Sequence, residues 1–293
     1  MIILTTPNWA DYELLDTGDG FRLERFGKYI LKRPDPQILW KPKLPKSDWE
    51  KASAIFENDK WKVKSKMPDK WIMEYKGLKF WVKLSPFKHT GIFPEQASQW
   101  DFISSVIAKS SMSLRSGESR RSNPSILNLF AYTGLASIAC AKSGTKVTHL
   151  DASRPAIGWA KENQQLSGLP EDSIRWILDD AIKFTAREIK RGIKYDGIIM
   201  DPPIYGHGPD GEIWDFNKDF PKLLENCQQI LSDKPLFIII NAYAISSSAI
   251  MLENMLQDLN LDGKIESGEL ALQENNDGRL LSTGIFARWS MID

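Results

Sequence analysis

Residues 125–134 of this 293-residue chain read Ser-Ile-Leu-Asn-Leu-Phe-Ala-Tyr-Thr-Gly, and residues 146–151 read Lys-Val-Thr-His-Leu-Asp. Each stretch begins with a short apolar run and ends in small or polar residues, and a longer amphipathic stretch follows it. This alternation is typical of parallel strands separated by helices. We expect such strands at residues 125–129, 146–150, 174–178, 195–200 and 235–241.

The last two apolar runs, residues 264–272 and 280–289, have only seven residues between them. A helix does not fit in that gap, so we expect an antiparallel hairpin. The fold class that follows is α/β, with a doubly wound, Rossmann-like, mostly parallel sheet of seven strands and the hairpin at one edge. We also expect a helix over residues 95–109 and, because residues 110–123 are rich in Ser, Arg and Gly, a surface loop after it.

The first 90 residues lack this alternation. Residues 12–27 predict two strands joined by a Gly/Asp turn, and residues 71–84 predict a second hairpin around Lys76 and Gly77. We therefore expect a small, β-rich N-terminal region over residues 1–90 and an α/β domain over residues 91–293.

The composition, with 42% hydrophobic and 26% charged residues, is that of an ordinary globular protein. No apolar run approaches the roughly 18 residues of a membrane-spanning helix. The N-terminus lacks the features of a signal peptide. Cys140 and Cys227 lie 87 positions apart, and the three histidines show no metal-ligand spacing. These features predict a cytoplasmic protein without a membrane segment, a structural zinc or a disulfide framework.

The net charge is zero, but the charges are unevenly distributed. Residues 1–90 contain 18 basic and 12 acidic residues, and residues 60–88 contain nine lysines against two acids, with six aromatic residues among them. Lysines can hold phosphates while aromatic rings stack on bases, so this stretch is a candidate nucleic-acid surface. A small β-unit with solvated lysines outside and aromatic residues inside would explain the same pattern.

In an open parallel sheet, ligands bind beyond the carboxyl ends of the strands. After the first strand comes a loop in which a glycine opens the next helix and lets backbone approach a ligand; it consists of Phe130, Ala131, Tyr132, Thr133 and Gly134. The single glycine is not the G-x-G-x-x-G pattern, which disfavours a dinucleotide. On its own, the loop is equally typical of a tight strand-to-helix turn.

Acidic residues follow the second and third strands. Asp151 comes 17 residues after Gly134, where a carboxylate can accept hydrogen bonds from both hydroxyls of a ribose. Asp180 could accept from the amino group of an adenine. Either carboxylate could instead only cap the helix that follows. Together, a small-residue loop and acids at successive strand ends predict a pocket for a nucleoside.

The fourth strand ends with Asp201, Pro202 and Pro203, the most specific motif in the chain. Two prolines remove two amide donors and fix φ, so we expect rigid, unpaired backbone carbonyls there. Carbonyl and carboxylate acceptors around one point suit a planar amino group that attacks an electrophile, with Tyr205 stacked on its ring. The alternative is a proline-stiffened loop that only ends a strand.

These segments, with Ala152, Ser153 and Asn163, have the order and spacing of class I S-adenosylmethionine-dependent methyltransferases. The chain most resembles the branch that methylates cytosine or guanine in ribosomal RNA and carries a small β-rich region ahead of the catalytic domain. Residues 89–96, which read His-Thr-Gly-Ile-Phe-Pro-Glu-Gln, are similar to the linker of that branch. The resemblance covers about residues 70–290.

The resemblance implies S-adenosylmethionine as the cofactor and no metal. The residues that it implies for the cofactor are Phe93, Gln96, Asn128, Phe130, Ala131, Tyr132, Thr133, Gly134, Asp151, Ala152, Ser153, Asn163, Asp180 and Asp201. Those that it implies for the methyl-accepting site are Asp201, Pro202, Pro203 and Tyr205.

The chain departs from the family in two places. Cytosine C5 methylation needs a thiolate that attacks the ring, and the family places this cysteine after the fourth or fifth strand. The loops directly after these strands, residues 201–205 and 241–244, contain no cysteine, and Cys140 and Cys227 lie in expected helices. Ile204 also stands where enzymes that methylate amino groups have an aromatic residue, so either Tyr205 stacks on the base instead or the target is not stacked in that manner.

We therefore expect a methyltransferase that modifies a base nitrogen in ribosomal or other RNA, rather than cytosine C5. One alternative is an enzyme of the same fold that methylates a small molecule or a protein. Another is a non-catalytic nucleic-acid-binding module, against which the complete set of Asp151, Asp180 and Asp201 argues.

Overall fold

The computed structural model describes residues 2–6, 8–115, 123–243 and 247–291. Internal contacts divide the chain into two units. The sheet unit comprises Met1–Leu4, Gln99–Leu270 and Thr283–Asp293, and the N-terminal unit comprises Thr5–Ser98 and Ala271–Ser282. The N-terminal unit therefore extends past the expected boundary at residue 90 and includes the tip of the C-terminal hairpin.

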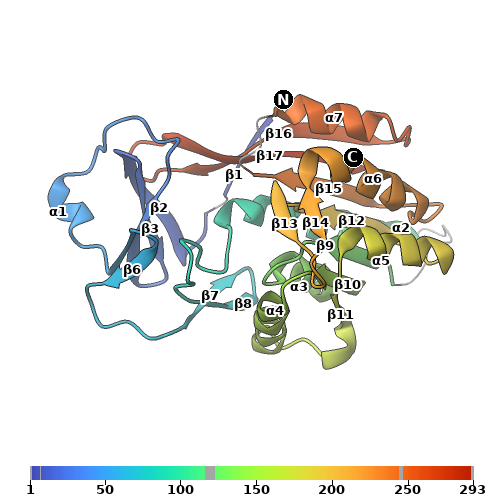
Figure 1. Ribbon diagram of the computed structural model, residues 1–293, viewed down its shortest axis with the longest axis horizontal. Coiled ribbons are helices and arrows are strands. Elements are labelled where there is room, and N and C mark those ends of the chain that lie inside the picture. Colours follow the sequence, from blue (N-terminus) through green and yellow to red (C-terminus); the bar gives the residue numbers. More distant parts are fainter. Residues whose placement is uncertain (1, 7, 116–122, 244–246, 292–293) are drawn as a thin grey trace. The chain divides into compact units, whose positions relative to one another are not determined.

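The sheet unit is built on eight strands in the order β1-β16-β17-β15-β12-β9-β10-β11 (Figure 1). Strands β9 to β12 and β15 pair in parallel, and β17 pairs antiparallel with β15. The strand order reverses between β9 and β12, which is where ligands bind in such sheets. The bounds are β1 (Ile2–Thr5), β9 (Ser125–Leu129), β10 (Lys146–Asp151), β11 (Ile174–Leu178), β12 (Gly197–Met200), β15 (Phe237–Ala242), β16 (Lys264–Gln273) and β17 (Leu280–Ser290).

This topology confirms the doubly wound, mostly parallel sheet and the terminal hairpin, and the seven expected strands agree with the observed bounds within two residues. The expected strand count is wrong by one. β1 lies beyond β16, so the hairpin is next to the edge of the sheet rather than at it. The backbone of Ile2 passes so close to Gly268 of β16 that no side chain would fit there.

Helices cover both faces of this sheet. Because successive side chains of a strand point to opposite faces, Leu127 and Leu129 of β9 face one layer of helices, and Asn128 faces the other. The first layer is α5 (Ala181–Lys190), α6 (Phe216–Gln229) and α7 (Ala249–Gln257). The second is α2 (Ala97–Arg115), α3 (Leu135–Lys142) and α4 (Arg154–Leu166). Two short 3-10 helices, η1 (Pro94–Gln96) and η2 (Glu171–Ser173), complete the set.

Helix α2 is longer than the sequence predicts. It continues to Arg115, so the expected surface loop over residues 110–123 is wrong for its first six residues. Serine and arginine are tolerated in a helix that a packed face already stabilises. The part of that expected loop at residues 116–122 lies outside the described residues.

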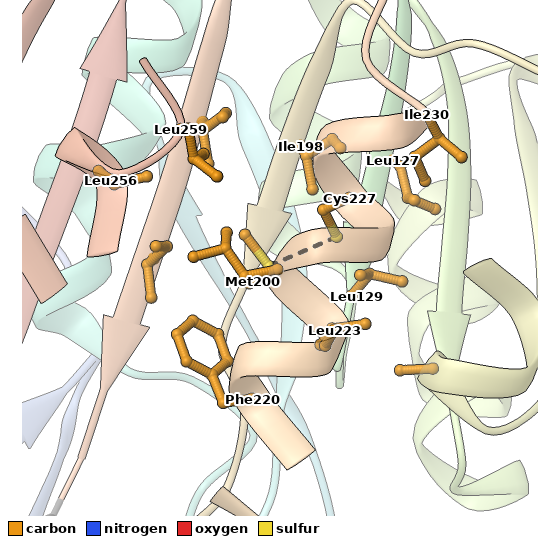
Figure 2. Close-up of a cluster of buried hydrophobic side chains, with 14 of the residues drawn as sticks. Leu127, Leu129, Ile198, Met200, Phe220, Leu223, Cys227, Ile230, Leu256 and Leu259 are labelled. Atoms are coloured by element: carbon orange, nitrogen blue, oxygen red, sulfur yellow. Dashed lines mark hydrogen bonds between the residues drawn. The ribbon is translucent and has the colours of Figure 1, made fainter. Parts of the chain in front are cut away.

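The core beneath the first helix layer also contains a cysteine. Figure 2 shows Cys227 of α6 beside Met200 of β12, with 3.7 Å between their sulfur atoms, among leucine, isoleucine and phenylalanine side chains. Cys140 of α3 is buried as well, and burial raises the pKa of both thiols well above the ordinary value. Both cysteines therefore behave as small apolar core residues.

The N-terminal unit contains a five-stranded sheet, β2-β3-β4-β5-β6, and a separate hairpin, β7-β8. The two hairpins expected from the sequence, β2-β3 and β7-β8, are confirmed. The bounds are β2 (Tyr12–Gly18), β3 (Phe21–Phe26), β4 (Tyr29–Pro34), α1 (Lys46–Trp49), β5 (Ala54–Glu57), β6 (Lys60–Val63), β7 (Trp71–Tyr75) and β8 (Leu78–Val82).

The tip of the β16-β17 hairpin is integrated into the N-terminal unit. Glu274 bridges to Leu14 of β2 through the backbone, and its carboxylate accepts a hydrogen bond from the hydroxyl of Thr17. The amide of Asn275 donates to the carbonyl of Leu14 at 3.0 Å. Residues nearly 260 positions apart thus form one small β-structure, which is why residues 271–282 group with the N-terminal unit.

Candidate functional site

Four neighbouring parallel strands end at the same edge of the sheet. Leu129 of β9 is in register with Leu150 of β10 and with Met200 of β12, and Asp151 of β10 is in register with Leu178 of β11. The segments that follow these strands therefore begin at one level. The glycine loop (residues 130–134) follows β9, and the proline loop (residues 201–204) follows β12.

The glycine loop turns sharply between β9 and α3. Phe130 and Tyr132 have φ angles of 56° and 48°, and Gly134, at the start of α3, has a φ of 84°. A Cβ atom at Gly134 would lie 2.9 Å from the Cβ of Ala160, which is closer than such atoms approach. Glycine is thus required there by conformation and by space. Non-glycine residues held at positive φ occur preferentially at functional sites.

The Asp151 carboxylate is held against this loop. Its Oδ2 accepts a hydrogen bond from the amide of Tyr132 at 2.7 Å, and its Oδ1 accepts from the amide of Ser153 at 2.8 Å. Burial raises the pKa of Asp151, and the hydrogen bonds from these amides oppose that rise. Each carboxylate oxygen has a further lone pair, so both oxygens can still accept from a hydroxyl group. The geometry fits a vicinal diol such as that of ribose.

Two of the predicted cofactor ligands support the glycine loop from within the core. Asn163 is fully buried and donates to the carbonyl of Thr133 at 2.9 Å. Asn128 is 2% exposed and donates to Oγ of Ser137 at 2.9 Å. Asn163 thus supports the loop directly, and Asn128 is bonded to the first turn of α3. The contact of either side chain with the cofactor stays a prediction.

Asp180 caps α5, as the alternative interpretation of the sequence foresaw, whereas α4 is capped by Ser153 rather than by Asp151. The hydroxyl of Ser153 accepts from the amide of Ala156 at 3.3 Å, and Oδ1 of Asp180 accepts from the amide of Lys183 at 2.9 Å. Ala152 lies between Asp151 and this cap, half-buried. A capping carboxylate keeps its second oxygen for another donor. The contact of Asp180 with an adenine therefore stays a prediction.

The proline loop is anchored by a hairpin that the sequence interpretation missed. After Ile204, the chain forms β13 (Tyr205–His207) and β14 (Ile213–Asp215), which pair antiparallel. The indole N–H of Trp214 donates to the carbonyl of Pro203 at 2.7 Å. The expectation of unpaired proline carbonyls is therefore wrong for Pro203, because a side chain remote in sequence supplies the missing donor. The turn residues Gly208, Pro209, Asp210 and Gly211 were the signal that could have predicted this hairpin.

Tyr205 lies on the outer face of this hairpin. It pairs with Asp215, and its ring meets that of His207 edge-on at 5.4 Å. Since alternate residues of a strand face opposite ways, Tyr205 points away from the side that Trp214 buries. The Tyr205 side chain is 56% exposed, so its ring is accessible to a partner from solvent. Pro202 is buried, and Asp201, which precedes it in the sequence, is half-buried.

Phe93 and Gln96 belong to the N-terminal unit, whereas all the other predicted site residues belong to the sheet unit. The ring of Phe93 lies 5.2 Å from that of His89, and Gln96 is buried at the end of η1. Their proposed contact with the cofactor stays a prediction.

The lysine-rich stretch of residues 60–88 contains both buried core side chains and exposed side chains. Trp71, Tyr75 and Phe80 are buried and form part of the core of the N-terminal unit. Trp81 is half-buried, and the ammonium group of Lys70 lies 4.4 Å from its ring centre. Ile72, which pairs with Trp81 across the hairpin, is 48% exposed. The outer face of the β7-β8 hairpin therefore carries the aromatic and basic surface of this stretch.

In the part of the chain that the structure describes, no helix is long and apolar enough to cross a membrane. Across the same residues, no group of three or more His, Cys, Asp or Glu side chains is arranged to hold a metal ion.

Comparison with known proteins gives consistent matches. A family model described as S-adenosylmethionine-dependent methyltransferase matches residues 60–261. The crystal structure of the SAM-dependent methyltransferase from Agrobacterium tumefaciens is similar with a TM-score of 0.92 and 38% identity, over 99% of this chain and 93% of that chain.

Two curated relatives match over shorter ranges. Ribosomal RNA large subunit methyltransferase K of Neisseria meningitidis is 24% identical over 243 residues, which cover 76% of this chain and 63% of that protein. Ribosomal RNA large subunit methyltransferase K/L of Shewanella frigidimarina is 31% identical over 180 residues, which cover 58% of this chain and 22% of that protein. The chain thus spans less than two thirds of the length of either relative.

Proposed function

This chain belongs to the S-adenosylmethionine-dependent methyltransferases, and we propose that it transfers a methyl group from S-adenosylmethionine to a nitrogen atom of a base in RNA, with ribosomal RNA as the favoured substrate. The observation that carries the proposal is the Asp151 carboxylate, oriented by the amides of Tyr132 and Ser153 at the sheet edge where the proline loop also begins. A cytoplasmic location is part of the proposal, because both thiols would stay reduced there.

We assign the cofactor site to the glycine loop and the two strands beside it. Residues 130–134 would approach the methionine part, Asp151 would accept from the ribose hydroxyls, and Asp180 would accept from the adenine amino group. The positive φ angle of Gly134 supports this assignment, because it brings backbone rather than a side chain to the ligand. When bound, S-adenosylmethionine supplies a methyl group on a sulfonium, which is already a strong electrophile.

The protein's own contribution is therefore alignment. We assign the acceptor to the proline loop, where the Asp201 carboxylate would accept hydrogen bonds from the attacking amino group and stabilise the charge that develops on it. Pro202 and Pro203 would hold the backbone rigid around that point. Tyr205 would stack on the acceptor base from the outer face of the β13-β14 hairpin.

A nitrogen acceptor is favoured over cytosine C5 because C5 chemistry needs a reactive thiolate. Cys140 and Cys227 are fully buried, and burial raises the pKa of both. They lie within α3 and α6 rather than in the loops directly after β12 and β15. An inert thiol in the core cannot attack a base.

RNA is favoured as the substrate class for two reasons. Both curated relatives are named as ribosomal RNA methyltransferases. In addition, the lysine-rich stretch contains nine lysines and two acids, and Trp81 and Ile72 lie on an outer face of its hairpin. Lysines and an accessible aromatic ring together suit a single strand, whose phosphates and bases they contact.

The test is methyl transfer from radiolabelled S-adenosylmethionine to total RNA, total protein and small metabolites, all prepared from cells that lack this gene. Label in a ribosomal RNA is the expected result, and mass spectrometry of the digested nucleosides then names the atom. Label confined to protein or metabolites would overturn the RNA substrate while leaving the cofactor site standing. Cofactor binding without any transfer would favour the non-catalytic alternative.

A further inference from the structure

One side chain, Trp214, joins the glycine loop to the proline loop. It lies on β14 in register with Gly206 of β13 and is 4% exposed. Its indole N–H donates to the Pro203 carbonyl at 2.7 Å, and its ring centre lies 4.9 Å from that of Phe130. Trp214 therefore contacts a residue of each loop at the same time.

Two of the four residues of the proline loop have no backbone donor, and the amide of Asp201 donates away from the loop, to the carbonyl of Leu129 at 3.4 Å. Pro202 and Pro203 have no backbone N–H, so the amides that would normally close a turn there are missing. The amide of Phe216 donates to the carbonyl of Ile204 at 2.9 Å, immediately beside the bond from Trp214. Gly206 leaves the space for this packing, since a Cβ atom there would lie 3.3 Å from Cγ of Pro203.

We infer that Trp214 is a positioning residue that fixes the proline loop and the glycine loop to one another and thereby aligns the methyl donor with the acceptor. The roles of the two loops rest on the proposed function, whereas the coupling between them rests on the contacts of Trp214. Transfer between two aligned groups is sensitive to displacements of about 1 Å. Because Trp214 contacts both loops, a ligand that orders the glycine loop should also order the proline loop. The coupling should also act in the other direction, since coupling between two sites is reciprocal.

Hydrogen exchange measured by mass spectrometry tests the coupling without a methyl acceptor. The probe is S-adenosylhomocysteine, added to the wild-type protein and to Trp214→Phe, which keeps a ring against Phe130 but removes the N–H donor. The control is Trp9→Phe, because the indole of the buried Trp9 also donates to a backbone carbonyl, that of Glu74, at 2.6 Å, but in the N-terminal unit.

In the wild type, S-adenosylhomocysteine should slow exchange in residues 130–134 and also in residues 204–207. In Trp214→Phe, residues 204–207 should exchange about five to ten times faster, and the probe should protect only the glycine loop. Trp9→Phe should resemble the wild type in both segments. Protection confined to the glycine loop in the wild type, or equal behaviour of the two variants, would overturn the inference.

A kinetic measurement adds a readout that a purely structural role would not move. With RNA as acceptor, Trp214→Phe should lower kcat about tenfold and leave the KM for RNA and the affinity for S-adenosylmethionine within twofold. Phe130→Leu should give a similar loss, and the double variant should lose less than the product of the two, since both side chains act through one contact. If no RNA is methylated, the proposed function fails, and the exchange experiment still decides the role of Trp214.

Discussion

The Asp151 carboxylate accepts a hydrogen bond from the backbone amide of Tyr132 at 2.7 Å, across 19 residues of sequence. This bond fixes the end of β10 to the glycine loop that follows β9. It is made to a residue with positive φ, whose amide is turned toward the carboxylate. Backbone amides thus orient the Asp151 carboxylate before any ligand binds, and the hydroxyls of a bound ribose would donate to its remaining lone pairs.

Gly134→Ala should destabilise the protein by about 2–4 kcal/mol, because it combines a positive φ with a steric clash. The added Cβ would lie 2.9 Å from the Cβ of Ala160. Gly144→Ala is the matched control, since Gly144 has a φ of 86° and nothing within 4 Å of the added atom. The Gly144→Ala variant should lose only about 1–2 kcal/mol in free energy of unfolding. Urea denaturation of both variants measures the difference, and equal losses would contradict the close packing around Gly134.

Asp201→Asn should retain the affinity for S-adenosylmethionine and lower kcat by about 10- to 100-fold, because the amide removes the charge that accepts from the attacking group. Asp210→Asn, an exposed acid in the turn of the β13-β14 hairpin, is the control and should leave both parameters unchanged. Calorimetry measures the affinity for S-adenosylmethionine, and single-turnover methylation measures the rate of methyl transfer. Unimpaired turnover in Asp201→Asn would remove Asp201 from the acceptor site.

Glu274 should make stability depend on pH between about 4.5 and 7. Burial raises the pKa of this carboxyl to about 7 from an ordinary value of 4.5. The folded state therefore binds this proton more tightly than the unfolded state, so the contribution of Glu274 to the free energy of unfolding should fall as pH rises through this window. The half-buried His89 and the buried His149, whose pKa values burial lowers to about 4 and about 3, contribute in the opposite direction below about pH 6.5. Glu274→Gln should remove the Glu274 contribution, so the free energy of unfolding of the variant should rise relative to that of the wild type as pH increases from about 4.5 to about 7.

The matched control for this pH dependence is Glu171→Gln, at an exposed position in η2. It should leave the pH profile of the wild type intact. Denaturation of the three proteins at a series of pH values measures this contribution. A difference in free energy of unfolding between Glu274→Gln and the wild type that stays constant between pH 5 and pH 7 would contradict the role assigned to the Glu274 carboxyl.

Trp81→Ala should weaken RNA binding about tenfold, because one stacked base contributes about 1–3 kcal/mol. Leu39→Ala should have no effect, since Leu39 is 90% exposed in the same unit but outside the lysine-rich stretch. Filter binding over a range of salt concentrations measures both the affinity and the number of phosphates contacted. Equal affinities for the two variants would move the RNA surface away from the β7-β8 hairpin.

Much of the sheet could be predicted from the sequence because its signals are local. The strands at residues 125–129 and 174–178 are bounded by polar residues and turn signals, and their observed bounds are those expected. Strand β1 could not be predicted, because Ile2 and Ile3 form too short a run, and their structure depends on the edge of β16 next to Gly268.

The site was predictable in outline but not in its hydrogen bonds. Asp151 and Gly134 stand at positions that chain order alone predicts to be close. The partner of the Pro203 carbonyl is Trp214, 11 residues later, and only the hairpin between them brings the indole to that oxygen. The hydrogen bond from Asn163 of α4 to the carbonyl of Thr133 likewise depends on how α4 packs beside the glycine loop, which no sequence pattern shows.

Calorimetric titration of the protein with S-adenosylmethionine tests the central claim most directly. The wild type should bind one equivalent, and Asp151→Asn should bind at least about tenfold more weakly, because a hydrogen bond to a charged acceptor contributes about 1.5–3 kcal/mol. Asp172→Asn, an exposed acid before β11, serves as the control and should bind like the wild type. Absence of binding by the wild type, or equal affinities of all three proteins, would contradict the cofactor site described here.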